Sequence, residues 1–196
     1  MAERAYWDPV PMLATAEGAP FGKNPLGTLT VLPTMREIFR GTWEMRNWRN
    51  VPGPFYGADT DTCWTGRMDA PDLVLYDDEY GTEFLFRQPT DPAEVYRLLL
   101  AATSDPFGGY AADGDEHWTT AAVREWWRNR ERLLEWIQRA RGTWHESPHA
   151  DHRELLGGLA AFERHIEHGL EGYLRRYSFW LDHRRPRRPG ETLPDL

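Results

Sequence analysis

The sequence predicts a mainly α-helical fold (α+β), with a long antiparallel C-terminal helix pair, one β-hairpin and long ordered Gly-rich loops. Apolar residues recur at steps of three and four over much of 119–182, which is the period of an amphipathic helix. Residues 73–88 hold two β-prone runs around an acidic turn that ends in Gly81. Because a lone hairpin is not stable in water, it must pack on helices or on another strand.

One globular domain is expected over residues 1–182. The chain has 196 residues, which is long enough for a hydrophobic core without disulfide bonds. Residues 1–32 are rich in Pro, Gly and Ala and show little periodicity, so they predict an irregular N-terminal arm on the surface. Residues 183–196 are rich in Arg and Pro and predict a mobile tail.

Two helices have clear start signals. Thr34 and Glu37 form a capping box, in which each side chain satisfies a backbone N–H of the first turn. The proline-rich stretch 51–54 is expected to end the helix that starts there. The helix after the hairpin starts with Asp91 as N-cap and Pro92 in the first helical position.

The chain ends in two long predicted helices. The first covers about 119–141, with Gly142 as its stop signal, and the second covers about 151–182. The short link between them makes the two helices antiparallel neighbours. We expect both to be continuous.

Composition argues against several classes of function. The net charge is −8, whereas a nucleic-acid binder needs a basic face to neutralise phosphates. No apolar run reaches the ~20 residues of a membrane span, and the N-terminus lacks the apolar core of a signal peptide. A single cysteine fits a reducing compartment. The expectation is a soluble cytoplasmic protein without a membrane or nucleic-acid partner.

Ten tryptophans are the most unusual feature of the composition. Tryptophan fills helical cores, but it also dominates the energetic hot spots of protein interfaces. Ten together predict at least one exposed cluster. The first functional hypothesis is therefore a non-catalytic partner-binding protein of the accessory, inhibitor or immunity type, which uses acidic loops and exposed tryptophans. No cofactor, metal or catalytic residue is assigned.

The segment "HESPH" (145–149) matches the zinc-protease pattern H-E-x-x-H, but it does not predict that site. Pro148 would clash with the preceding turn, so the five residues do not form one continuous helix. The pair of histidines one helical turn apart is then lost. A non-protease metal site using His145, His149 and His152 is a weaker alternative to solvated histidines at a helix start.

The irregular loop 52–66 carries four candidate binding residues. Cys63 is the only possible thiolate nucleophile, although a lone cysteine is more often a small buried hydrophobic residue. Trp64 follows it. Asp59 and Asp61 form a D-x-D pair that can bind a metal or simply shape a turn. We expect the loop, including Cys63, to be buried and structural, and Cys63 to be inert.

Arg130 is predicted to lie in the middle of the apolar arc of the 119–141 helix. A buried guanidinium needs an anion, because unpaired desolvation costs several kcal/mol. The expected partner is a carboxylate from a Gly-rich loop, and the alternative is an anionic ligand. Trp126 lies on the flank of the arc, where it can face a partner.

His165 is surrounded on its side of the last helix by Gly158, Gly169 and Gly172. Glycine costs about 1 kcal/mol relative to alanine inside a helix, so three on one stripe indicate close packing or a groove. His117 lies in the second Gly-rich loop, residues 104–118, whose Asp113 and Asp115 are among the acids expected to pair with Arg130. The alternative functional hypothesis is a small enzyme or ligand-binding protein, with a site between the two Gly-rich loops near Cys63, His117 and Arg130.

Overall fold

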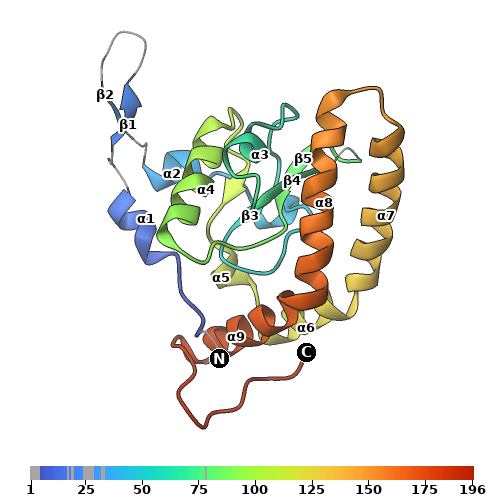
Figure 1. Cartoon of the computed structure of the whole chain (residues 1–196). Coiled ribbons are helices and arrows are strands. Elements are labelled where there is room, and N and C mark those ends of the chain that lie inside the picture. The colour runs from blue at the N-terminus through green and yellow to red at the C-terminus, as the bar shows by residue number, and fades with distance from the viewer. Residues whose placement is uncertain (1–4, 17, 19, 24–28, 32–33, 78) are drawn as a thin grey trace. The chain divides into compact units, whose positions relative to one another are not determined.

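Helices form about half of the structure and short antiparallel strand pairs add a small β part, which confirms the mainly α fold class. The computed structural model describes residues 5–16, 18, 20–23, 29–31, 34–77 and 79–196. Figure 1 shows the course of the chain.

Contacts divide the chain into two compact units. The first, which we call the hairpin unit, comprises Asp8–Asn50 and Pro54–Asp113. The second, the helical unit, comprises Met1–Trp7, Val51–Gly53 and Gly114–Leu196. This division does not test the prediction of a single domain over residues 1–182, which stays a prediction.

The hairpin unit combines short helices with three two-stranded antiparallel pairs among its described residues: β1 with β2, β3 with β6, and β4 with β5. Its elements in chain order are α1 (Pro11–Ala16), β1 (Pro20–Lys23), β2 (Leu29–Val31), α2 (Met35–Ile38), the 3-10 turn η1 (Trp43–Met45), β3 (Tyr56–Gly57), α3 (Thr65–Asp69), β4 (Val74–Asp77), β5 (Thr82–Leu85), α4 (Pro92–Ser104) and β6 (Tyr110–Ala111). The predicted irregular arm thus contains α1, β1 and β2 among its described residues.

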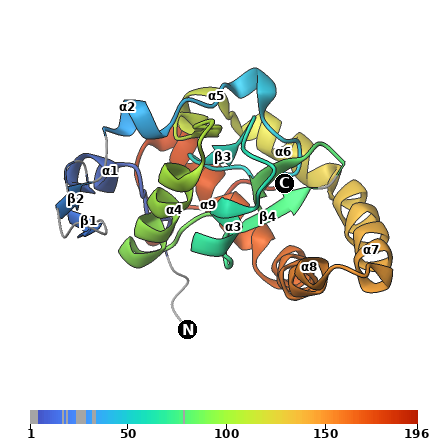
Figure 2. The same cartoon turned by 90° about the horizontal axis from the view of Figure 1, so that it is seen from above.

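The β4–β5 hairpin is the one that the sequence predicts. Val74 pairs with Leu85 and Asp77 with Thr82, and Gly81 adopts a φ of +69° in the connecting turn, where glycine has no steric penalty. α3 contacts both β4 and α4, as Figure 2 shows. Fully buried apolar residues of this segment are Leu73, Val74, Leu75, Phe84, Leu85 and Phe86.

The capping box at the first predicted helix is confirmed, but the helix is much shorter than expected. The Glu37 carboxylate accepts the Thr34 backbone N–H at 2.9 Å, yet α2 ends at Ile38. Beyond it the backbone bonds to a distant segment instead of continuing the helix: the Gly41 N–H donates to the Tyr110 carbonyl at 2.9 Å. A Cβ at Gly41 would overlap the neighbouring carbonyl of Gly109, so glycine is needed for this approach.

The Asp91 helix start is also confirmed. The Asp91 carboxylate accepts the Glu94 N–H at 2.9 Å, and Pro92 is the first residue of α4. Glu94 in turn forms a two-pronged pair with Arg87, at 2.7 and 3.0 Å. These short-range contacts fix the entry of the chain into the helix.

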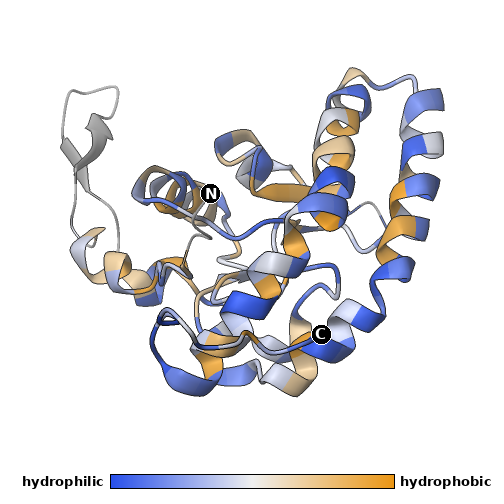
Figure 3. Cartoon of the chain, turned by 60° about the horizontal axis from the view of Figure 1, so that its bottom comes forward, coloured by the Kyte–Doolittle hydropathy of each residue, from blue (hydrophilic) through white to orange (hydrophobic). Residues whose placement is uncertain are grey.

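The helical unit contains the predicted antiparallel pair, which α7 and α8 form side by side (Figure 1). Hydrophobic and hydrophilic residues alternate along both helices in Figure 3, as amphipathic helices require. The helices of this unit are α5 (Gly114–His117), α6 (Thr120–Arg128), α7 (Arg130–Glu146), α8 (Ala150–His168) and α9 (Leu170–His183).

The predicted helix over 119–141 is broken and ends later than expected. Asn129 separates α6 from α7, and its side chain donates to the Glu125 carbonyl at 3.0 Å, in competition with the helical backbone. Gly142 does not stop α7, which continues to Glu146. A Cβ at Gly142 would meet open space, and this glycine is an exposed helix residue.

The predicted helix over 151–182 is broken at Gly169. Its N–H still donates to the His165 carbonyl at 3.0 Å, but its φ of −138° is not helical and the chain changes direction into α9. α9 then contacts α6. One of the three glycines noted in the sequence therefore marks a corner and not a groove.

The C-terminal tail makes several contacts within the helical unit. Arg185 pairs with Glu191 at 2.5 and 2.8 Å, and hydrogen bonds from the Arg185 side chain lower the pKa of Glu191 to about 2. The Arg175 guanidinium donates to the carbonyls of Pro194 and Leu193. Leu193 itself is buried. The mobility predicted for 183–196 stays a prediction beside these contacts.

Candidate functional site

Most of the 52–66 loop is buried, as predicted. Residues 52–58 are buried, and β3 within them pairs with β6 from the second Gly-rich loop. A Cβ at Gly57 would overlap the backbone carbonyl of Glu83, so the glycine lets two backbones meet. The glycines and aromatics here serve the packing of the hairpin unit.

Cys63 corrects one prediction, because it is exposed and not buried. Its neighbour Asp61 is the buried residue: the Asp61 carboxylate accepts the Cys63 N–H at 2.9 Å and the Thr65 hydroxyl at 2.7 Å. Trp64 adopts a φ of 62° at the start of α3, and its ring centroid lies 5.0 Å from that of Tyr76. Asp61 therefore shapes a turn, whereas Asp59 is exposed.

A buried carboxylate that the sequence analysis missed lies behind this loop. Glu83 is fully buried and accepts three hydrogen bonds: from the Gly66 N–H at 3.0 Å, the Arg67 N–H at 2.7 Å and the Tyr110 hydroxyl at 2.8 Å. Burial outweighs these hydrogen bonds and raises the pKa of Glu83 to about 7.

This shift predicts a loss of stability as pH rises. Because the folded pKa exceeds the unfolded value of 4.5, the folded state holds the Glu83 proton more tightly, and its contribution is fully present below pH 4.5. The contribution is lost as pH rises through about 7. Its size is about 3 kcal/mol, since each pKa unit corresponds to about 1.4 kcal/mol. Denaturant unfolding across this pH range measures it.

Glu83→Gln removes the titrating group, so the variant is expected to lose this part of the pH dependence. Any cost of mismatched hydrogen bonds in the variant is constant with pH. Glu116→Gln, a change at an exposed glutamate, serves as the control and should keep the wild-type profile. Parallel pH profiles for wild type and Glu83→Gln would contradict the assignment.

A second buried charge was also missed. The side chains of Arg49 and Asp77 are both fully buried and form an ion pair, and Arg49 also reaches Glu79 at 2.5 Å. The Asn47 amide donates to Asp77 at 3.0 Å. Burial raises the pKa of Asp77 and lowers that of Arg49, while the opposite charge of each partner counteracts the shift. The one sequence signal is an acid directly ending the apolar run "LVLY".

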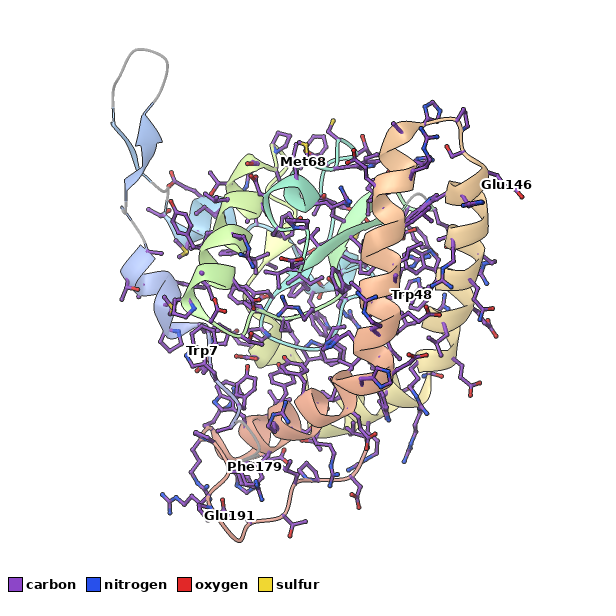
Figure 4. All side chains as sticks on the ribbon, viewed as in Figure 1. Trp7, Trp48, Met68, Glu146, Phe179 and Glu191 are labelled. Carbon is purple, nitrogen blue, oxygen red and sulfur yellow. The ribbon has the colours of Figure 1, made fainter. Side chains whose placement is uncertain are left out.

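The arginine of this ion pair contacts two aromatic residues that line a surface pocket of about 350 Å³. The Arg49 guanidinium lies 4.5 Å from the ring centroid of Trp48 and 5.4 Å from that of Tyr80, so it makes cation–π contacts with both aromatic side chains. Figure 4 marks Trp48. The pocket is lined by Met45, Arg46, Asn47, Trp48, Asp59, Tyr80 and Thr82, and we call it the Met45–Tyr80 pocket.

Most polar groups of the pocket are committed to internal bonds. The Asn47 amide nitrogen donates to Thr82 as well as to Asp77, and its oxygen accepts the Arg49 N–H. The Arg46 guanidinium stacks 3.8 Å above the Trp43 ring and donates to the Trp43 carbonyl at 2.8 Å. Asp59 is exposed, and its carboxylate forms no hydrogen bond with any other described residue. Of the residues singled out in the sequence, only Asp59 lines this pocket.

Arg130 does not have the environment that the sequence predicts. It is the first residue of α7 and only half-buried, and its guanidinium stacks 4.4 Å from the Trp127 ring and donates to the Trp127 carbonyl. No carboxylate among the described residues pairs with it. The helix break at Asn129 explains the difference, because the two arms of the predicted apolar arc no longer share one axis.

Two acids expected to pair with Arg130 instead accept tyrosine hydroxyls. Asp115 accepts from Tyr177 at 2.6 Å within the helical unit. Asp113 accepts from Tyr56 at 2.7 Å within the hairpin unit. Together with burial, these negative partners raise the pKa of both tyrosines.

The other candidates of the helical unit lie on three separate helices. His117 is exposed at the end of α5, and Trp126 is half-buried in α6. His165 is half-buried in α8, where a Cβ at Gly169 would lie 3.2 Å from its Nδ1 atom. The glycine therefore accommodates the imidazole and does not line a groove.

The "HESPH" segment crosses a corner between two helices, as Pro148 predicts. His145 lies in the last turn of α7, and His149 precedes α8. His152 packs beside His149, with ring centroids 5.6 Å apart, and its Nδ1 atom lies 2.8 Å from the Ser147 hydroxyl. Within the described part of the chain, no three His, Cys, Asp or Glu side chains are grouped so that they could hold a metal ion.

Comparison with protein-family models, with curated proteins and with solved structures finds no match to this chain. Among the helices of the described residues, none has the length and apolar character needed to cross a membrane.

Proposed function

We propose that this chain is a cytoplasmic, non-catalytic protein that binds a protein partner through the Met45–Tyr80 pocket, as an accessory, inhibitor or immunity-type protein does. The proposal rests on the residue types that line the pocket and on the internal bonds that hold them in place. Tryptophan, tyrosine and arginine dominate interface hot spots, and methionine adapts to varied partner surfaces. All four types line this pocket.

The apolar surface available to a partner differs from the one that the sequence predicts. None of the ten tryptophans is fully exposed: Trp118, Trp136, Trp144 and Trp180 are buried, and the other six are half-buried. The exposed large apolar side chains of the pocket are Met45, at 54%, and Tyr80, at 57%. Trp48 therefore forms a wall of the pocket, while Met45 and Tyr80 offer the contact area.

Rigidity supports the same proposal. Binding orders mobile side chains at an entropic cost, so a pocket held in place by internal bonds binds with less loss. The buried Arg49 stacks against Trp48 and Tyr80, and Asn47 is fixed by three hydrogen bonds. The acidic overall charge favours a protein partner over a nucleic acid.

A photo-crosslinking amino acid placed at position 80 tests the proposal in an extract of the source cells. We expect one protein to be crosslinked and identified by mass spectrometry. Calorimetry with that purified protein should then show at least about tenfold weaker binding for Tyr80→Ala, which is the loss typical of an interface anchor.

Phe107 supplies the matched control, because it is an aromatic residue of the same unit, 65% exposed and outside the pocket. A crosslinker at position 107 should not capture the protein, and Phe107→Ala should bind it normally. Equal capture from both positions, or equal weakening by both variants, would refute the role of the pocket.

A small-molecule ligand is a second candidate function for the same pocket, because its volume of about 350 Å³ falls within the usual range of ligand sites. Cys63, His117 and Arg130, on which the alternative from the sequence is centred, do not line this pocket, and that alternative stays a prediction. Thermal stabilisation by one compound of a metabolite collection, lost in Tyr80→Ala, would favour it over the partner-binding function.

A further inference from the structure

We propose that the Met45–Tyr80 pocket holds a cationic side chain, a lysine or an arginine, supplied by the partner. The inference rests on the proposed function and specifies the chemistry of the occupant. It combines the exposed carboxylate of Asp59 with the aromatic walls Trp48 and Tyr80 in one cavity.

The first argument is charge. Among the residues that the structure describes, Asp59 is the one acid that lines the pocket; it is exposed, and none of them donates a hydrogen bond to its carboxylate. A carboxylate at the wall of a pocket can accept from an ammonium or guanidinium group, and such charge-assisted bonds are about twice as strong as neutral ones. An anionic occupant would be repelled at the same position.

The charged groups in and around the pocket also favour a cationic occupant. Arg46 is the one cation among the described residues of the lining, and its guanidinium stacks on the Trp43 ring and donates to the Trp43 carbonyl. Arg49 is buried and neutralised by its own acids. Among the described residues, the charged groups of the lining and those that act on Arg46 and Arg49 comprise these two guanidinium groups and four carboxylates, Glu44, Asp59, Asp77 and Glu79.

The second argument is shape and polarity. Lysine and arginine carry three or four methylene groups below the charge, and such stems pack along apolar surface. Met45, Trp48 and Tyr80 provide that surface, and the aromatic faces also attract cations. Both N–H groups of the Asn47 amide already donate, to Asp77 and Thr82, so this amide offers an incoming side chain no free donor.

The test uses single capped amino acids as probes, followed by NMR of the ¹⁵N-labelled full chain. The probes are the Nα-acetyl methylamides of arginine, lysine, norleucine and glutamate. We expect the arginine or lysine derivative to shift the Trp48 indole and the Asp59 and Tyr80 amide signals saturably, with at least about tenfold higher affinity than norleucine.

Asp59→Asn is the decisive variant, because it keeps the shape and removes the charge. It should lower the affinity for the cationic probe at least about fivefold, toward the level of norleucine, while the aromatic faces still attract the cation. Asp72→Asn is the matched control at an exposed aspartate of the same unit and should bind as wild type does. An unchanged amide spectrum outside the pocket verifies the fold of each variant.

Three results would overturn the inference: equal binding of norleucine and the cationic probes, no effect of Asp59→Asn, or no saturable shift at the pocket by either cation. Each of these leaves the proposed function open to its own test. If the crosslinked partner still depends on Tyr80, the pocket is a protein-binding site whose occupant is not cationic.

Discussion

Arg49→Met is expected to destabilise the folded protein by about 3–5 kcal/mol, because it leaves the Asp77 carboxylate buried without its cation. Methionine roughly keeps the volume, so little of the loss comes from packing. The remaining partners of Asp77 are the Asn47 amide and the Glu79 N–H, which do not supply a positive charge. Denaturant unfolding monitored by circular dichroism measures the change.

The control is Arg141→Met. Arg141 pairs with Glu163 at 2.5 Å, but its side chain is 43% exposed, so solvent screens the pair and the expected loss is about 1 kcal/mol or less. The prediction fails if the two variants lose the same stability. A selective loss at Arg49 would also show how much the walls of the Met45–Tyr80 pocket depend on a charge beneath them.

Trp144→Ala is expected to cost about 3–5 kcal/mol, the range for large aromatic residues deleted from a core. Trp144 is fully buried on α7 and lies edge-on to Trp136, with ring centroids 6.2 Å apart. Its ring centroid is also 6.2 Å from that of His152 on α8. Removing the indole therefore leaves a cavity between the two helices, and the unfolding midpoint in denaturant should fall accordingly.

Trp126→Ala provides the comparison, because Trp126 is half-buried on α6 and its site opens to solvent. Its loss should be clearly smaller than that of Trp144→Ala. Equal losses would mean that the α7–α8 contact does not rest on Trp144, and the assignment of the helix pair as a core element would be wrong.

The parts of the fold that the sequence predicts are those fixed by neighbours in the chain. The capping box of Thr34 and the N-cap of Asp91 each involve residues three positions apart, so the pattern contains all the interacting groups. The hairpin around Gly81 is local in the same way. The length of α2 was not predictable, because the carbonyl that accepts the Gly41 N–H belongs to Tyr110.

The helix breaks have a similar explanation. Asn129 and Gly169 are weak breakers, and many such residues occur inside continuous helices. What decides here is the contact of α9 with α6 and of α8 with α7, which no local pattern reveals. The prediction for Arg130 failed as a consequence, since it assumed one continuous helical axis through Asn129.

The candidate site was mostly beyond reach of the sequence. Asp59 was selected as part of the D-x-D pair with Asp61, but Trp48 and Tyr80 come from separate segments. Arg49 joins them by stacking on both rings, and its ion pair with Asp77 spans 28 positions in the chain. An apolar run ending in an acid indicates a buried charge, but it does not identify the cation.

The helical unit combines segments from both ends of the chain, and this limits the order in which it can assemble. Tyr6 lies within 5.3–6.2 Å, ring centroid to ring centroid, of Tyr173, Tyr177 and Trp180, and the Tyr173 hydroxyl donates to the Pro52 carbonyl 121 positions earlier. During synthesis on the ribosome, Tyr6 therefore cannot make these contacts until residues 173–180 have been synthesised. Contacts between residues so far apart in sequence slow folding and leave apolar groups exposed to chaperones in the meantime. The hairpin unit, in contrast, is complete once residue 113 has emerged from the ribosome.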